Sequence, residues 1–175
     1  TTTLAIQAAL TGHLVFSTLH TNDSATSIPR LIDLGGEPFL IASVLNAALA
    51  QRIVRKICEH CKEEFIPEQN IQENIRQVLG ELIPKQYKDQ TQIKLYRGRG
   101  NCQECQDTGY YGRIGIFEVL KVTPAINKLI LQEANSKDIY AQSVKDGLIN
   151  MKQDGFLKAL AGITTLEEIL RVAEI

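Results

Sequence analysis

The chain has 175 residues, 44% of them hydrophobic and 22% charged, and a formal net charge of −1. This composition disfavours disorder and permits one large domain, or one domain with a small added module. Nearly equal numbers of basic and acidic residues argue against nucleic acid as a main partner, because nucleic-acid-binding proteins usually carry a basic excess. The longest apolar stretch, residues 39–50, is too short to span a membrane, and no signal peptide is recognised. We therefore expect a cytosolic protein.

The first zone, residues 1–57, predicts part of an α/β sheet protein. An Ala-rich helix should end at Gly12, and residues 13–19 should form a buried strand. A second helix should run to Leu34, where Gly35 and Gly36 close it. A third helix should start at Pro38, with one buried face made of residues at helical spacing: Ile41, Val44, Leu45, Ala48 and Leu49. One strand makes no sheet, so further strands must come from an upstream segment or a partner.

The second zone, residues 58–120, contains all four cysteines, and the third, residues 121–175, is predicted to be helical. The second zone also predicts a strand over 113–120 and an amphipathic helix within a polar insertion at 62–101, the helix marked by Ile71, Ile75, Val78, Leu79 and Leu82. In the third zone, Thr123 and Pro124 are typical of a helix start, and Thr164 with Glu167 matches a capping box.

The four cysteines form two Cys-x-x-Cys pairs, Cys58 with Cys61 and Cys102 with Cys105. Two such turns brought together give the tetrahedral four-sulfur shell of structural zinc, and no cysteine is left over. Disulfides fit a cytosolic chain poorly, and a redox Cys-x-x-Cys would normally occur once. Buried core cysteines and an iron–sulfur cluster remain alternatives. His60, between the first pair, is interpreted as a bystander that at most supports the ligands.

His13 and His20 bracket the expected strand, too far apart along it to share one metal ion. In open α/β sheets, ligands bind beyond the carboxyl ends of strands, so His20 with Thr21 and Asn22 is a candidate sensor of a phosphate or a catalytic water. The alternative is that His20 caps the next helix and that His13 is an ordinary surface histidine. The glycine-rich stretches 98–100 and 112–115 lack the Gly-Lys-Ser/Thr ending of a phosphate-binding loop.

Residues 5–22 resemble the histidine-box region of the type II secretion and type IV pilus-assembly ATPases. The resemblance continues through residues 30–35, 37–43 and 50–55, the two cysteine pairs and residues 112–118. It covers nearly the whole chain except the insertion at about 64–95. It implies the C-terminal part of a RecA-like motor domain (1–57), a tetracysteine metal-binding module (58–120) and a helical C-terminal subdomain (121–175).

The resemblance further implies a hexameric ring at the cytoplasmic side of the inner membrane. There, the intact protein would bind ATP and Mg²⁺, and ATP hydrolysis would drive pilus or pseudopilus assembly through an inner-membrane platform protein. His13 and His20 would support hydrolysis, with His20 nearer the nucleotide, and Cys58, Cys61, Cys102 and Cys105 would hold zinc. The cysteines argue against the pilus-retraction branch, which resembles this chain in the histidine box but lacks the zinc module.

Three family features are missing from these residues: the phosphate-binding loop, the magnesium-coordinating acidic strand and the acidic box. Without amides and a lysine around the phosphates, we expect no ATP hydrolysis by these 175 residues alone. The start at Thr1, without Met and inside a helical pattern, indicates a piece of a longer protein. A stand-alone zinc-stabilised interaction module is the alternative, and a zinc-ribbon nucleic-acid binder is a weaker one, because few basic residues lie near the cysteines.

Overall fold

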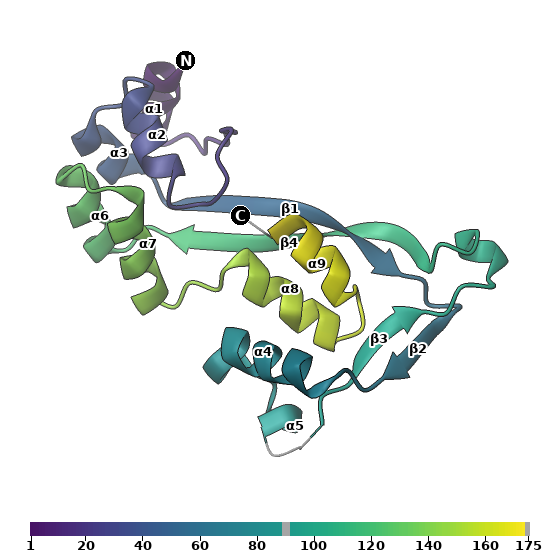
Figure 1. Ribbon diagram of the computed structural model, residues 1–175. Helices are drawn as coiled ribbons and strands as arrows, with labels where there is room; N and C mark the ends of the chain where they lie inside the picture. The colour runs from purple at the N-terminus through teal and green to yellow at the C-terminus, as the bar shows by residue number, and fades with distance from the viewer. Residues whose placement is uncertain (89–91, 174–175) are drawn as a thin grey trace. The chain divides into compact units, whose positions relative to one another are not determined.

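The computed structural model describes residues 1–88 and 92–173, without the side chain of Ala173, and divides into two compact units. Unit 1 comprises residues 1–50 and 118–149, and unit 2 comprises residues 51–117 and 150–175. Two long strands, β1 (Ala47–Ile57) and β4 (Tyr110–Lys121), pair with each other and contribute residues to both units. The chain thus enters unit 2 through β1 and leaves it through β4 (Figure 1).

Unit 1 is built from short helices whose apolar side chains meet in one core. Ile28, Ile126, Ile130 and Ile139 are fully buried there, together with Leu120 from β4. Helix α3 packs against both α1 and α6, and α6 packs against α7. The helices of this unit are α1 (Thr2–Leu10), α2 (Ser27–Asp33), α3 (Pro38–Val44), α6 (Pro124–Leu131) and α7 (Ser136–Lys145).

Unit 2 combines a second two-stranded sheet with a helical core. Strand β2 pairs antiparallel with β3, with Lys62 opposite Gly98 and Phe65 opposite Leu95. Helix α8 is central, since it contacts α4, α9 and β3 and buries Phe156. The remaining elements are β2 (Lys62–Phe65), α4 (Gln69–Leu79), the 3₁₀ turn η1 (Gly80–Leu82), α5 (Lys85–Lys88), β3 (Leu95–Gly98), the 3₁₀ turn η2 (Gln103–Cys105), α8 (Met151–Leu160) and α9 (Leu166–Ala173).

Within unit 2, side chains from α8, from α9 and from the turn between them form hydrogen bonds with backbone groups of β1 and β4. On β1, Glu168 accepts a hydrogen bond from the Arg55 N–H, and the Thr164 hydroxyl donates to the Arg55 carbonyl. On β4, Asp154 accepts from the Phe117 N–H, and the Lys158 ammonium donates to the Gly115 carbonyl. Because unpaired strand edges recruit other strands, this arrangement stabilises a ribbon of only two strands.

Several predicted elements are confirmed. Helix α1 ends just before Gly12, which has a φ of +91°. The second helix, α2, starts at Ser27, so that Pro29 falls in its first turn, where a proline is tolerated. The amphipathic helix of the insertion is α4, and the strand over 113–120 lies within β4. The Thr123 side chain accepts from the Ile126 N–H and caps α6 as predicted.

Three local predictions are wrong. Residues 13–19 are not a strand and are mostly exposed, because no described strand lies beside them to accept and donate ladder hydrogen bonds. The third helix ends at Val44, and Ala48 and Leu49 of its predicted buried face belong to β1. At α9 the cap is Thr165, whose hydroxyl accepts from the Glu168 N–H. The Thr164 hydroxyl instead donates to the Arg55 carbonyl on β1.

Candidate functional site

The four cysteines converge in unit 2 into one cluster, although forty or more residues separate the two pairs. Their sulfur atoms all lie within 4.8 Å of one another. Sγ of Cys58 lies 3.9 Å from that of Cys102, and Sγ of Cys61 lies 3.8 Å from that of Cys105. All four are free, so no disulfide links them. His60 is exposed and is not among the grouped ligand atoms.

The first cysteine turn is fixed by backbone hydrogen bonds on both sides. Cys58 N–H donates to the Gly109 carbonyl at 3.0 Å, and Cys61 N–H donates back to the Cys58 carbonyl at 3.3 Å. The Cys61 carbonyl in turn accepts from Arg99 N–H at 2.8 Å. The turn is therefore attached both to the second cysteine loop and to the residue after β3.

The second cysteine turn is closed by Asp107 and requires left-handed backbone. The Asp107 carboxylate accepts from Cys102 N–H at 2.6 Å, and Asp107 N–H donates to the Cys102 carbonyl at 3.1 Å. Gln106 and Asp107 both have positive φ, an uncommon conformation for residues other than glycine. A carboxylate that accepts the neighbouring amide is one of the local bonds that hold such a turn.

Two glycines allow the cysteine loops to approach each other. A Cβ placed on Gly98 would lie only 2.3 Å from the Gly109 carbonyl oxygen, so no side chain fits there. Gly109 has a φ of +75° and donates its N–H to the Cys105 sulfur at 3.3 Å. Such N–H donors to a thiolate fix the ligand and tune its charge in metal sites.

The thiols of the cluster differ in acidity. Burial is the main cause that raises the pKa of Cys61 to about 11, and its thiol neighbours add to the effect. For Cys105, burial also acts upward, but the Gly109 N–H and the neighbouring thiols outweigh it and lower the pKa. Four thiolates this close repel one another, so full ionisation calls for a central cation.

The geometry of the cluster fits a single metal ion. Four sulfurs bound tetrahedrally at about 2.3 Å from one ion would lie roughly 3.8 Å apart. The Sγ–Sγ distances of 3.9 Å between Cys58 and Cys102 and 3.8 Å between Cys61 and Cys105 match that value. Cys58, Cys61, Cys102 and Cys105 therefore can hold one metal ion as a closed shell without an open position for substrate. Such a site supports structure rather than catalysis.

The two histidines lie in unit 1 at the ends of an exposed segment that forms neither helix nor strand. His13 follows Gly12, and its Nδ1 lies 3.0 Å from the Thr11 hydroxyl. His20 is exposed and precedes the turn that leads into α2. Between them, Leu14 and Phe16 are 80% and 88% exposed. The pattern did not predict this exposure.

A buried carboxylate anchors the residues that follow His20. Glu118, only 3% exposed, accepts from Ser24 twice: from the N–H at 3.0 Å and from the hydroxyl at 2.5 Å. Asp23 holds the next turn by accepting from the N–H and hydroxyl of Thr26. The role of Glu118 was missed because it lies 94 positions from Ser24; an acidic residue at an inward-facing position of a strand was the available signal.

Comparison with known proteins shows the family. The model of the type II/IV secretion system protein family matches residues 1–171. The type IV pilus assembly ATPase PilB of Pseudomonas aeruginosa is 43% identical over 175 residues, which is 99% of this chain and 29% of that protein. PilB of Thermus thermophilus is 44% identical over 170 residues, 97% of this chain and 18% of that protein. The type II secretion system ATPase E of Vibrio cholerae is 40% identical over 174 residues, 99% of this chain and 32% of that protein.

The chain belongs to the type II/IV secretion system protein family. The family match and the cysteine cluster confirm the predicted fold class, an α/β, RecA-like class with a small metal-binding module. The chain spans less than a third of the length of the three relatives described above. Among the helices of residues 1–88 and 92–173, none is long and apolar enough to cross a membrane.

Proposed function

We propose that the chain is the C-terminal part of a hexameric motor ATPase that drives assembly of type IV pili or of a type II secretion pseudopilus. The observation that supports this proposal is the similarity, over nearly the whole chain, to proteins named as pilus-assembly and secretion ATPases. The intact protein would bind ATP and Mg²⁺, act at the cytoplasmic side of the inner membrane, and work through a platform protein there. The domain limits 1–57, 58–120 and 121–175 stay part of this proposal.

In this proposal His20 and His13 support hydrolysis, and His20 is nearer the nucleotide. Its position fits: it is exposed, and the turn that follows it is tied to the buried Glu118 through Ser24. The exposed Leu14 and Phe16 support a second element of the proposal, that other residues of the intact protein cover this segment. The phosphate-binding loop would come from those residues too.

The metal in this proposal is zinc, held by the four cysteines. Four thiolates in tetrahedral geometry are typical of structural zinc, and the sulfur separations fit one ion rather than a cluster with several irons and bridging sulfides. When bound, zinc would supply no chemistry to ATP; it would join the turn at Cys58–Cys61 to the turn at Cys102–Cys105.

The test of the motor proposal is the ATPase activity of the intact protein and its histidine variants. His20→Ala should lower kcat by about 100-fold or more, the range for loss of a residue that positions or transfers a proton in the transition state. His13→Ala should have a smaller effect. The exposed His60 provides a matched control, and His60→Ala should leave kcat unchanged. The 175 residues alone should show no turnover.

Two results would contradict the proposal. If His20→Ala retained the activity of His60→Ala, the assigned role of the histidine box would be wrong. If the intact, folded protein hydrolysed no ATP, the alternative of an interaction module without catalysis would replace the motor.

A further inference from the structure

In unit 2, two arginines share one buried carboxylate. Glu168 is 2% exposed and accepts four hydrogen bonds, two from Arg55 and two from Arg171. Arg171 binds both carboxylate oxygens, through Nε at 3.0 Å and Nη2 at 2.9 Å. Arg55 contributes its backbone N–H at 2.9 Å and its Nη2 at 2.7 Å. Two guanidinium groups thus have one carboxylate between them.

This sharing leaves positive charge without a counter-anion. A carboxylate has about four acceptor sites, and all four of those on Glu168 are used. The cluster of Arg55, Arg171 and Glu168 therefore carries a formal charge of +1, and Glu168 has no site left for a third donor. The Arg55 guanidinium also stacks on the Tyr110 ring, 4.1 Å from its centroid, which fixes its plane.

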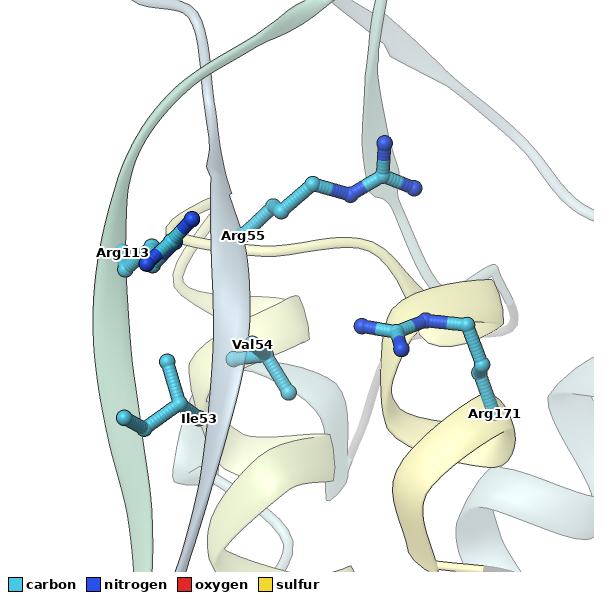
Figure 2. A pocket seen from close by; sticks show the side chains of 5 residues that line it. All are labelled: Ile53, Val54, Arg55, Arg113 and Arg171. Atoms are coloured by element: carbon cyan, nitrogen blue, oxygen red, sulfur yellow. The ribbon is translucent and has the colours of Figure 1, made fainter.

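A third arginine faces the same pocket. Arg113 on β4, Arg55 on β1 and Arg171 on α9 line a cavity of about 370 Å³ together with Ile53 and Val54. Figure 2 shows Arg55 and Arg113 coming from the two strands and Arg171 reaching from its helix toward β1. Within residues 1–88 and 92–173, the Arg113 guanidinium has no ion-pair or hydrogen-bond partner. Among the described residues, no acidic side chain lines the cavity. The three lining arginines, together with Glu168 that pairs with two of them from outside the lining, sum to a formal charge of +2.

We propose that this pocket is a binding site for a phosphate group. Guanidinium groups bind phosphate oxygens through paired hydrogen bonds, and all N–H donors of the Arg113 guanidinium are available for such bonds. A phosphate dianion balances the formal charge of +2, which a single carboxylate would not. The volume exceeds that of a lone phosphate, and Ile53 and Val54 provide an apolar wall for an organic group attached to it. The site is independent of the histidine segment, and the proposal does not rest on ATP hydrolysis.

The experiment measures phosphate binding to the intact protein by equilibrium dialysis with radiolabelled inorganic phosphate. A saturating non-hydrolysable ATP analogue with Mg²⁺ is present throughout, so that a nucleotide site cannot take up the label. Arg113→Gln should weaken binding by about 10- to 100-fold, the effect of removing one charged hydrogen-bonding group. Arg113→Lys, which keeps the charge but loses the fork, should lie between. Lys137→Gln, the same loss of charge at an exposed residue of unit 1, should bind as the unmodified protein does.

Two further probes distinguish the source of the phosphate. Mg²⁺-free ATP tests a free nucleotide, and sedimentation with phosphatidylglycerol vesicles, against phosphatidylcholine vesicles, tests a lipid headgroup. Binding of any probe that Arg113→Gln weakens and Lys137→Gln does not would support the site and name its source. If no probe binds, or if both variants bind every probe equally, the proposal is overturned. Because Arg113 is exposed and unpartnered within the described ranges, the variant should fold, and an unchanged unfolding temperature checks this.

Discussion

The tetracysteine cluster and the histidine segment are the two regions with the strongest functional signals, and they differ in how complete they are. Around the cysteines, each loop is held by backbone hydrogen bonds, by Asp107 and by the close approach of Gly98 and Gly109. The histidine segment, residues 13–20, has no strand beside it among the described residues, and its apolar side chains are exposed.

The two sites use different kinds of support. A structural metal site needs only ligands and the loops that aim them, so residues of one unit can build it entirely. A strand needs at least one neighbouring strand, because its backbone N–H and C=O groups find no hydrogen-bond partners within the strand itself. We therefore expect the first region to respond to changes in its own residues and the second to respond to its anchor at Glu118.

The largest expected effect is loss of the metal. Cys102→Ser removes one of four ligands, and structural zinc contributes about 10–16 kcal/mol of apparent binding free energy that is coupled to folding. We expect the variant to lose its zinc, and amide hydrogen exchange to accelerate over residues 58–65 and 95–110. Metal analysis by atomic emission and exchange measured by mass spectrometry check both results.

Gln103→Ser is the matched control, because Gln103 is exposed and lies next to Cys102 but offers no thiolate. It should keep one zinc per chain and unchanged exchange. A Cys102→Ser protein that retained full protection over both cysteine loops would show that these loops need no metal. In that case, hydrogen bonds alone would hold the two cysteine loops.

The second effect tests unit 2 away from the metal, at Glu168. Although burial acts to raise its pKa, hydrogen bonds from Arg55 and Arg171 outweigh it and lower the pKa to about 2. An unfolded glutamate titrates near 4.3, so the ionised group contributes roughly 3 kcal/mol above that pH, lost as the pH falls toward 2. Glu168→Gln should therefore be destabilised by about that amount at pH 7, and the difference should shrink below pH 4.3. Urea unfolding across this range measures it.

Metal loss at low pH affects both proteins equally and cancels in the difference between them. Glu167→Gln is the control, since Glu167 is the exposed neighbour on the same helix. It should differ little from the unmodified protein at any pH. A Glu168→Gln difference that stayed constant from pH 7 to pH 3 would contradict the assigned pKa.

The sequence predicted correctly those features that depend on residues close together in the chain. The Cys-x-x-Cys spacing itself encodes two ligands on one turn, so all four cysteines were identified and the structure brings them together. The start of α6 was predicted for the same reason, because Thr123 and Pro124 act on their own helix. Strand β1 was missed because Leu49 and Ile53 are apolar yet exposed, so no alternation of apolar and polar residues marked it.

Features made by distant residues could not be read from spacing. Arg55, Arg113 and Arg171 meet only because β1, β4 and α9 meet, and nothing in the sequence pairs them. The buried strand expected at residues 13–19 failed for the related reason that burial depends on neighbours. The segment is rich in residues that favour strands, but none of the described strands pairs with it.

The smallest expected effect concerns Glu118, the buried anchor of the turn after His20. Glu118→Ala leaves the Ser24 N–H and hydroxyl without their acceptor in a buried position, which costs about 1–3 kcal/mol for an unsatisfied group. We expect amide exchange to accelerate at Ser24 and over residues 21–28. Glu118→Gln keeps a carbonyl oxygen that can accept both bonds, so it should recover most of the protection. Hydrogen exchange followed by mass spectrometry measures these effects.

Glu133→Ala, at an exposed acidic residue of the same unit, controls for the loss of one negative charge. If Glu118→Ala and Glu133→Ala exchange alike over residues 21–28, the carboxylate does not hold the turn. If Glu118→Gln loses as much protection as Glu118→Ala, charge rather than the acceptor oxygen matters. The expected order, with alanine much worse than glutamine, would show that a hydrogen-bond acceptor on β4 holds the turn after His20 through Ser24, although the residues before His20 form no strand.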